Sequence, residues 1–264
     1  MKIARIKLPD SQTVWAAQQE DGALVRLYGD PLFGQAKLSA ETVEPAGWLA
    51  PIDPRVIMCI GRNYAEHAAE GGAPPPEYPI LFMKNPAAAT GHLQPVRIPR
   101  VCDDEVDYEG ELAVVIGRPA LNVPRSQALD YVLGYCAAND ISARVWQENK
   151  GGSQWCRGKS FDTFAPLGPV LVTADELTDP SGLAIRTTLN GREVQNSNTS
   201  KMIFDVPALI EFLSQGTTLL AGTVILTGTP HGVGWARSPR LTLKAGDSVT
   251  VNIEKIGSLT NAIE

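Results

Sequence analysis

Two glutamates separated by a single residue are the first candidates for a functional site. Glu109 and Glu111 fall at the start of the apolar run in DYEGELAVVIG (107–117). Side chains alternate across a strand, so both carboxylates are expected on one face, and Gly110 between them allows a close approach to the backbone. Two such carboxylates repel each other unless a cation lies between them, and hard oxygen ligands suit Mg²⁺, Mn²⁺ or Ca²⁺. The alternative is a solvated acidic strand end, because further acidic residues lie just upstream.

A third acidic residue follows a second apolar run. The run VLGYCAA ends at an Asn-Asp pair, and a helical pattern continues near 141–148. By itself this pair fits a helix N-cap, a position that favours Asn and Asp. If the two glutamates bind a metal, Asp140 is the natural third carboxylate. Further along the expected helix, Gln147 lies two turns on, and Arg144 and Glu148 have the spacing of an i,i+4 ion pair.

A histidine–glutamate pair lies in GRNYAEHAAEGG (61–72). Asn63 is placed to cap a short helix over about 64–70, which two glycines end. His67 and Glu70 share a face of that helix, and a carboxylate touching an imidazole orients it and raises its basicity, which makes a general base. The helix is too short to be stable alone and precedes the stretch APPPEYP, which indicates a lid over a substrate. The alternative is an exposed helical turn with an incidental His–Glu pair.

Two loops supply further polar groups. In CRGKSFDTF, Lys159 could neutralise a developing enolate if it is buried near the carboxylates, whereas the alternative is a surface lysine. The GKS triplet does not mark a phosphate-binding loop, because Ser153 stands where the motif needs its first glycine. In TGTPHGVG (227–234), Thr229 and the amides around it are available as donors in a tight loop after a strand.

Short strands must position these residues. Apolar runs such as LAVVIG, PVLVT and SVTVNI recur, each bounded by Gly, Pro, Asn or Asp, which is typical of a strand-rich domain. The clearest helix is FDVPALIEFLSQG, with Asp205 as N-cap and Gly216 after its end. Residues 1–53 predict a small N-terminal β-rich domain, in which ALVRLYG pairs with VWAAQQ, and residues 54–264 predict the main domain.

Composition and charge exclude several classes of protein. Of 264 residues, 44% are hydrophobic and 20% charged, with a formal net charge of −6, which is typical of an ordinary globular protein. An acidic chain does not favour nucleic-acid binding, and no apolar run approaches the ~18 residues of a membrane helix. The N-terminal MKIARIKLPD lacks the apolar stretch of a secretory signal, and the four cysteines have no zinc spacing. We therefore expect a cytoplasmic protein with free thiols.

Taken in order, the motifs resemble those of the fumarylacetoacetate hydrolase family. GRNYAEHAAEGG, a KNP segment, DYEGELAVVIG, NDISARVWQ, GKSFDTFAPLGP, LNGREVQNSNTSKMIF and ILTGTPHGVG follow the family's order over roughly residues 55–260. The resemblance implies a mainly β fold with a few helices (α+β), a mixed β-sandwich roll preceded by the small N-terminal domain. It also implies a homodimer.

The resemblance further implies roles for single residues. Three positions match the ligands of Mg²⁺ or Mn²⁺, two match a general-base pair on the lid, one matches the active-site lysine, and two match substrate contacts. In that order they are Glu109, Glu111 and Asp140; His67 and Glu70; Lys159; Gln147 and Thr229.

Such a site supports several reactions of a small 2-oxo acid, because the acid's carboxylate and 2-oxo oxygens chelate the cation and a pyruvate enolate is stabilised. We predict hydrolysis of the C–C bond in an acylpyruvate-type 2,4-dioxo acid, fumarylpyruvate or a simpler acylpyruvate, since a His–Glu pair can activate water. The alternatives are decarboxylation of oxaloacetate and isomerisation of a dicarboxylate from aromatic degradation, because fold does not decide between them. A non-catalytic metal-binding relative is disfavoured by the survival of the base, the lysine and the carboxylates together.

Substrate specificity depends on residues that spacing does not identify. From charge alone, Arg62 and Arg157 are candidates for binding a second carboxylate of the substrate. Candidates for the walls of the pocket are Tyr78, Phe82, Trp146 and Trp155.

Overall fold

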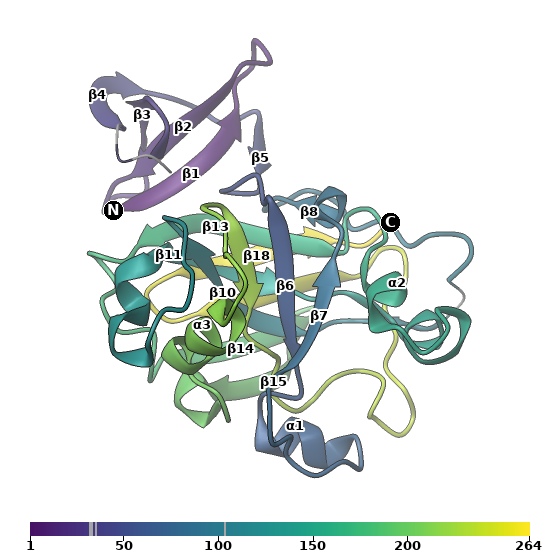
Figure 1. The fold of residues 1–264 in the computed structure, drawn as a ribbon. Coiled ribbons are helices and arrows are strands. Elements are labelled where there is room, and N and C mark those ends of the chain that lie inside the picture. The colour runs from purple at the N-terminus through teal and green to yellow at the C-terminus, as the bar shows by residue number, and fades with distance from the viewer. Residues whose placement is uncertain (32–33, 35, 103) are drawn as a thin grey trace.

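The computed structural model describes residues 1–31, 34, 36–102 and 104–264. Over these residues the chain is mostly β, with a few short helices, as predicted (Figure 1). The helices are α1 (Ala65–Glu70), α2 (Trp155–Lys159), α3 (Val206–Ser214), the 3₁₀ turns η2 (Pro86–Ala88), η3 (Arg125–Tyr131) and η5 (Thr199–Lys201), and the π turn η4 (Trp146–Lys150). The strands are β1 (Lys2–Lys7), β2 (Thr13–Gln18), β3 (Leu24–Tyr28), β4 (Lys37–Thr42), β5 (Gly47–Leu49), β6 (Val56–Gly61), β7 (Ile80–Lys84), β8 (Ala89–Thr90), β9 (Val106–Asp107), β10 (Gly110–Ile116), β11 (Val132–Asn139), β12 (Ser142–Ala143), β13 (Ala165–Thr173), β14 (Ala184–Leu189), β15 (Arg192–Asn198), β16 (Thr223–Leu226), β17 (Ser248–Ile253) and β18 (Gly257–Ala262).

One large mixed sheet carries most of the strands. Its order is β4-β3-β2-β1-β13-β11-β10-β16-β6-β7, with β5 beside β1 and β8 beside β13. The pairs β10–β11 and β10–β16 are antiparallel, whereas β16 and β6 are parallel. A second sheet, β15-β14-β17-β18, packs through β14 and β17 against β10 and β11. Strands β10 and β11 therefore lie at the centre of the molecule.

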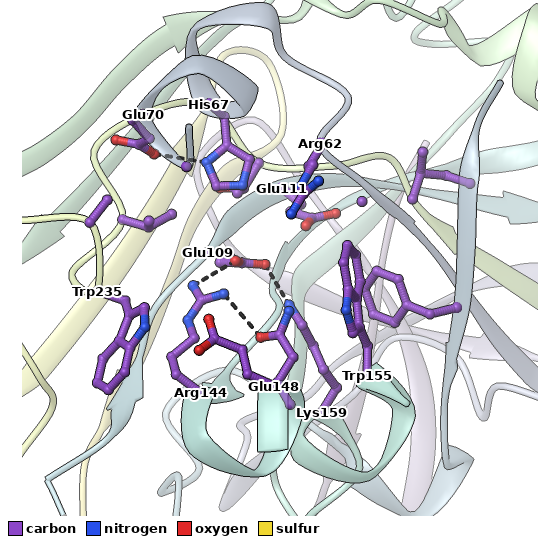
Figure 2. Close-up of a pocket in the computed structure, with 18 residues that line it drawn as sticks. Arg62, His67, Glu70, Glu109, Glu111, Arg144, Glu148, Trp155, Lys159 and Trp235 are labelled. Atoms are coloured by element: carbon purple, nitrogen blue, oxygen red, sulfur yellow. Dashed lines mark hydrogen bonds and ion pairs between the residues drawn. The ribbon is translucent and has the colours of Figure 1, made fainter. Parts of the chain in front are cut away.

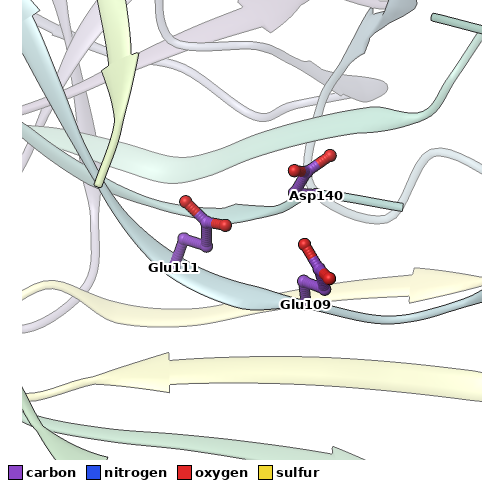
Figure 3. A group of neighbouring side chains, drawn as sticks. All are labelled: Glu109, Glu111 and Asp140. Carbon is purple, nitrogen blue, oxygen red and sulfur yellow. The ribbon is translucent and has the colours of Figure 1, made fainter. Parts of the chain in front are cut away.

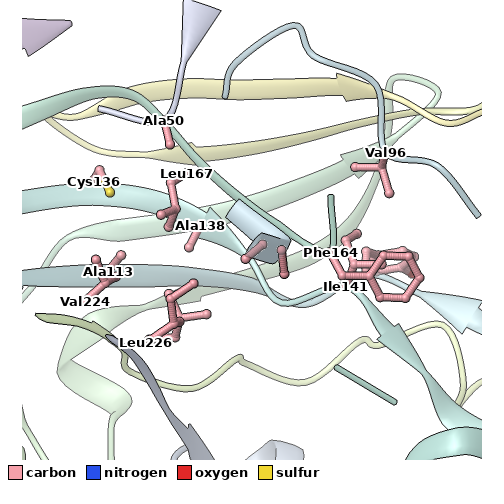
Figure 4. Packing of buried hydrophobic residues seen from close by; sticks show 14 of the residues in the cluster. Ala50, Val96, Ala113, Cys136, Ala138, Ile141, Phe164, Leu167, Val224 and Leu226 are labelled. Carbon is pink, nitrogen blue, oxygen red and sulfur yellow. The ribbon is translucent and has the colours of Figure 1, made fainter. Parts of the chain in front are cut away.

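Both faces of the central strands are buried. Along β10 the side chains of Leu112, Val114 and Ile116 join one hydrophobic cluster, and those of Ala113 and Val115 join another on the opposite face. Figure 4 shows the second cluster, packed between β10, β11, β13 and β16. A strand covered on both faces reads as a continuous apolar run, which is the pattern in LAVVIG. These strands form a rigid base for the polar residues at their ends.

Residues 1–53 contain the antiparallel strands β1 to β5. The predicted hairpin is confirmed, because β2 and β3 pair with Ala17 opposite Val25. Its turn uses Gly22 in the left-handed conformation (φ +88°), and Asp21 accepts a hydrogen bond from the amide of Ala23 at 3.0 Å. Strand β1 also pairs with β13 and so joins this segment to the large sheet. The division into domains at residue 53 stays a prediction.

Two predicted helices had different outcomes. Helix α3 begins after Asp205, whose side chain accepts a hydrogen bond from the amide of Ala208 at 2.9 Å, and Gly216 follows with φ +64°, as predicted. The helix predicted near 141–148 is wrong, because the segment forms the short strand β12 and the π turn η4. Strand β12 pairs with β9, so tertiary hydrogen bonding overrides the local helical pattern.

Two further expectations concern the whole chain. The four cysteines are free thiols, as predicted. Among the residues that the structure describes, none of the helices has both the length and the apolar character needed to cross a bilayer.

The contact between β5 and the loop after β8 gives a test of how the N-terminal segment packs. A Cβ on Gly91 would lie 2.4 Å from the carbonyl carbon of Leu49 and 2.6 Å from the oxygen of Trp48. Both are backbone atoms, so no side-chain rotation relieves the clash. We predict that Gly91→Ala lowers the free energy of unfolding by about 1–3 kcal/mol in urea titrations. Gly47→Ala is the control, because its nearest neighbours lie 3.6 Å away or farther; equal stability of the two variants would contradict this packing.

Candidate active site

Three buried carboxylates meet where two central strands end. Glu109 and Glu111 flank Gly110 at the start of β10, and Asp140 follows β11 directly. The register places Gly110 opposite Asn139, and the amide of Asp140 donates to the carbonyl oxygen of Glu109 at 2.8 Å. One oxygen from each carboxylate lies within 4.8 Å of the others, and each residue is at most 4% exposed (Figure 3). The structure thus brings together the three residues predicted as metal ligands.

Two buried lysines hold this cluster. Lys159 Nζ lies 2.7 Å from Glu109 Oε2 and 2.8 Å from Asp140 Oδ2. Lys84 Nζ donates to the other carboxylate oxygen of Asp140 and, at 3.1 Å, to the carbonyl oxygen of Ile141. Burying a charge is costly unless it is paired, so each lysine offsets the burial of a carboxylate. The surface reading of Lys159 is therefore excluded.

Arg144 is the third buried cation of the site. Its Nη2 lies 2.6 Å from Glu109 Oε1, and its Nε lies 2.6 Å from Asp107 Oδ1. The predicted ion pair of Arg144 with Glu148 is wrong, because buried carboxylates occupy the guanidinium and Glu148 is exposed. Gln147 Oε1 accepts a hydrogen bond from Arg144 Nη1 at 3.1 Å, which leaves the Gln147 amide nitrogen as its donor.

The electrostatic environment differs between the two glutamates. Burial, and then the two neighbouring carboxylates, raise the pKa of Glu111 well above its usual range. Burial also acts to raise the pKa of Glu109, but Arg144 and Lys159 outweigh it and hold that pKa below its usual range. Glu111 accepts a hydrogen bond from the Gly228 amide at 2.7 Å, and no cation among the described residues pairs with it. The cluster thus has hard oxygen donors and one uncompensated carboxylate, which fits a divalent cation such as Mg²⁺ or Mn²⁺.

The histidine–glutamate pair faces the cluster from α1. His67 Nδ1 lies 2.7 Å from Glu70 Oε1, and Glu70 Oε2 accepts a hydrogen bond from the Gly232 amide at 2.9 Å. Because Nδ1 is turned toward the carboxylate, Nε2 is the nitrogen that faces the cavity (Figure 2). A carboxylate on one ring nitrogen sets the tautomer and orientation of the other, so the pair has the arrangement of a general base.

Contacts from distant segments hold α1 in place. The prediction that Asn63 caps the helix is wrong. Its side-chain amide instead donates to the carbonyl oxygens of Phe204 and Thr227 at 2.9 and 2.7 Å. Glu66 lies 3.0 Å from Lys201 and 2.7 Å from His231. A helix of six residues needs such support. Its closure as a lid over a substrate stays a prediction.

One cavity of about 280 Å³ joins the pair to the cluster. Gln147 and Thr229 line it, as expected of substrate-contacting residues. Asp140 is not among the lining residues, but its carboxylate contacts Lys159, which lines the cavity. The lining residues are Ile60, Gly61, Arg62, His67, Glu70, Gly71, Phe82, Glu109, Glu111, Arg144, Gln147, Glu148, Trp155, Lys159, Thr229, Val233, Trp235 and Ala236.

Half of the residues suggested as walls or anchors lie elsewhere. Phe82 and Trp155 line the cavity, whereas Tyr78 is 64% exposed. Trp146 and Arg157 lie outside the lining, with the Arg157 guanidinium stacked 4.7 Å from the centre of the Trp146 ring. Arg157 is therefore wrong as an anchor for substrate in this cavity, and Arg62 is the arginine of that pair that lines it.

Two buried residues at the site escaped the sequence analysis. Gln195, on β15, accepts a hydrogen bond from the Gly110 amide and donates one to Thr229 Oγ1, each at 2.9 Å. It therefore joins the backbone between the two glutamates to the 227–234 loop. The sequence gives only a weak indication that Lys84 is buried. Side chains of β7 alternate between exposed and buried, and Lys84 falls on the buried face. No sequence pattern marks Gln195.

The fold and the site together indicate a class of protein in which a mixed β roll holds three buried carboxylates across one cavity from a His–Glu pair. The chain belongs to the fumarylacetoacetate hydrolase family, because the family model described as Fumarylacetoacetate (FAA) hydrolase C-terminal matches residues 56–264. The resemblance inferred from the motifs is thereby confirmed.

Relatives in this family differ in the reactions that their names give. Oxaloacetate tautomerase fahd2, mitochondrial, from Xenopus laevis is 50% identical over 81% of this chain and 67% of its own length. The solved structure of 5-carboxymethyl-2-hydroxymuconate delta-isomerase from Mycobacterium smegmatis is 39% identical, has a TM-score of 0.86, and covers 100% of this chain and 99% of its own. Fumarylpyruvate hydrolase from Pseudomonas aeruginosa, in complex with Mn²⁺ and pyruvate, is 30% identical with a TM-score of 0.74, covering 85% of this chain and 92% of its own. These likenesses confirm the predicted roll and place the chain in an enzyme superfamily.

The carboxylate cluster predicts how metal changes stability. We expect Mn²⁺ at one hundred times its dissociation constant to stabilise the fold by about 2.7 kcal/mol, and oxalate, which mimics a chelating 2-oxo acid, to add a further increment. Glu111→Gln removes an anionic ligand and is expected to abolish both increments in thermal unfolding. Glu193→Gln, at an exposed position on β15, is the control and keeps them. A full response in Glu111→Gln would contradict the assignment of the cluster.

Proposed function

We propose that this chain is a metal-dependent tautomerase of a 2-oxo dicarboxylic acid such as oxaloacetate, which moves one proton between C3 and the 2-oxo oxygen. One observation carries the proposal: His67, held by Glu70, faces a buried three-carboxylate cluster and Lys159 across a single cavity. A relative named as an oxaloacetate tautomerase is 50% identical, which favours proton transfer over bond cleavage.

The cation of this proposal is Mg²⁺ or Mn²⁺, held by Glu109, Glu111 and Asp140. A cation held there would accept the carboxylate and 2-oxo oxygens of the acid as ligands and would polarise the 2-oxo group. Three protein ligands leave coordination positions for those two oxygens. The similar solved structure of fumarylpyruvate hydrolase is a complex with Mn²⁺ and pyruvate, which supports a divalent cation and a 2-oxo acid as the ligands of this site.

The residues of the chain supply the charge and the proton transfer. Lys159, held by Glu109 and Asp140 at 2.7 and 2.8 Å, keeps a positive charge beside the oxygen that becomes negative. His67 Nε2 takes the proton from the enol hydroxyl and delivers it to C3, or the reverse, while Glu70 stabilises the imidazolium that carries it. The proton leaves one atom of the substrate and returns to another, so the reaction needs no further reactant.

The two residues predicted to contact substrate have different roles in this proposal. Gln147 has its oxygen engaged by Arg144, so its amide nitrogen is the donor available to the acid. Thr229 Oγ1 donates to the carbonyl oxygen of Gly110 at 3.0 Å and accepts from Gln195, so its hydroxyl is already engaged. Thr229 therefore contributes by fixing the shape of the loop at the cavity wall.

Hydrolysis of an acylpyruvate is the second candidate, because the same His–Glu pair can activate water. His67 would take a proton from the water that attacks the distal carbonyl, the C–C bond would break, and the proton would return to C3 of pyruvate. The products are pyruvate and one carboxylic acid. The likeness to a fumarylpyruvate hydrolase, at 30% identity, supports this candidate less strongly than 50% identity supports the first.

The two candidates are separated by one set of assays with Mg²⁺ present. The wild type is expected to accelerate the decay of the enol absorbance of oxaloacetate, and His67→Asn to slow it by about 10²–10⁴-fold. His92→Asn is the control, because His92 accepts a hydrogen bond from the Thr260 amide and lies outside the cavity lining. Pyruvate released from acetylpyruvate or fumarylpyruvate, with no acceleration of enol decay, would favour the hydrolase. Pyruvate released from oxaloacetate would indicate decarboxylation.

We also propose that the chain forms a homodimer through the free edge of β7. Strand β7 ends the large sheet, and it exposes Leu81 and Met83 by 45% and 43%. An exposed apolar strand edge is a site for pairing with another chain. Light scattering is expected to give twice the chain mass of 28.3 kDa, and Leu81→Lys with Met83→Lys to give the monomer mass. A monomeric wild type would contradict the proposal.

A further inference from the structure

Arg62 is a cation of the cavity that the mechanism leaves unused. Arg144 and Lys159 also line the cavity, and both are paired with buried carboxylates. Among the described residues, Arg62 has no carboxylate partner, and its contact is the ring of Trp155, 5.7 Å from the guanidinium carbon. Arginine recognises planar anions through its fork of donors, so an unpaired guanidinium facing a cavity points to an anionic group on the ligand.

The backbone holds Arg62 in a fixed position. Its φ of +55° lies in the left-handed region, which a non-glycine residue adopts only where the surrounding structure imposes it. The next residue, Asn63, supplies that constraint, because its side chain bonds to Thr227 and both accepts from and donates to Phe204, all within 2.9 Å. The fold therefore fixes the backbone position from which the Arg62 side chain enters the cavity.

The wall behind the guanidinium is equally fixed. A Cβ on Gly61 would lie 2.3 Å from the Trp155 ring, so the glycine allows the indole to pack directly against the backbone of β6. Trp155 also packs edge-on against Phe82, with ring centres 5.5 Å apart. The indole shields one face of the guanidinium and leaves the donor edge for a ligand. Trp155 begins α2, which ends at Lys159, so the arginine and the lysine belong to one connected wall.

Outside the three-carboxylate cluster, Glu148 is the other charged lining residue for which no ion pair is found among the described residues. It is exposed and comes from η4, whereas Arg62 directly follows β6; Figure 2 draws Arg62 in the upper part of the view and Glu148 in the lower part. Glu148 therefore leaves Arg62 available to an anion and disfavours an anion at the opposite rim.

We propose that Arg62 binds the second carboxylate of the substrate, and that this contact makes the site selective for 2-oxo dicarboxylic acids over monocarboxylic ones. The inference rests on the proposed function, in which the first carboxylate and the 2-oxo group lie at the three-carboxylate cluster. It deepens that function, because chelation at the cluster is common to every 2-oxo acid and cannot discriminate between them. Arg62 is thus a specificity-determining residue, whose removal changes affinity for one class of acid only.

The test compares acids of equal length that differ in the distal carboxylate. With Mg²⁺ present, calorimetry is carried out with 2-oxoglutarate against 2-oxopentanoate, and competition assays with oxaloacetate against 2-oxobutyrate. The wild type is expected to bind the dicarboxylates at least about tenfold more tightly. Arg62→Met should weaken the dicarboxylates by about tenfold or more and the monocarboxylates by less than about twofold. Arg62→Lys, which keeps the charge but loses the fork, should lie between them.

Arg157→Met is the matched control, because it removes an arginine stacked on a tryptophan just outside the cavity and should keep wild-type selectivity. Equal affinity of the wild type for both classes would overturn the inference without any variant. Equal weakening of both classes in Arg62→Met would overturn it as well, because the arginine would then only shape the wall. Enol decay is measured separately: selectivity without turnover contradicts the proposed function alone, and turnover without selectivity contradicts this inference alone.

Discussion

Burial of like charges at one point is the constraint on which the rest of the structure depends. Glu109, Glu111 and Asp140 lie within 4.8 Å of one another in the interior, an arrangement that repulsion and loss of hydration both oppose. Lys84 and Lys159 offset part of that cost through direct contacts with two of the carboxylates. Arg144 offsets a further part, and Glu111 is left without a cation among the described residues, which is why we propose a divalent cation at this cluster. The central strands, covered on both faces, are what keep these groups from moving apart.

The surrounding loops are attached to the same point. Gln195 links the Gly110 amide to Thr229, and the Gly228 amide donates to Glu111. A few residues further along the same loop, the Gly232 amide donates to Glu70 of the His67–Glu70 pair. The 227–234 loop therefore connects Glu111 of the carboxylate cluster to Glu70 of the His67–Glu70 pair.

This architecture explains how one family includes tautomerases, isomerases and hydrolases. In the proposed function, the buried part of the site would activate any acid that carries a carboxylate beside a carbonyl, and His67 would move a proton from the substrate or from water. What distinguishes the reactions is the group that extends from C3 toward the rim. In this chain the rim carries Arg62 against Trp155 on one wall and Glu148 on another. Under the proposed function, specificity and reaction type therefore depend on a few residues outside the buried cluster.

Most of the candidate site residues and the family could be predicted from the sequence alone. Alternation placed Glu109 and Glu111 on one face, helical spacing paired His67 with Glu70, and the order of the motifs identified the family. Which charged side chains form ion pairs with one another depends on the tertiary structure. Arg144 pairs with Asp107 and Glu109, although local spacing indicated Glu148, because a buried carboxylate attracts a cation more strongly than a hydrated one. Pairing of β12 with β9 replaced a predicted helix by a strand and a turn, and other long-range contacts brought Lys84 and Gln195 into the site. Local patterns report on neighbours a few positions apart, whereas contacts across 34 to 85 positions depend on how strands pair and pack.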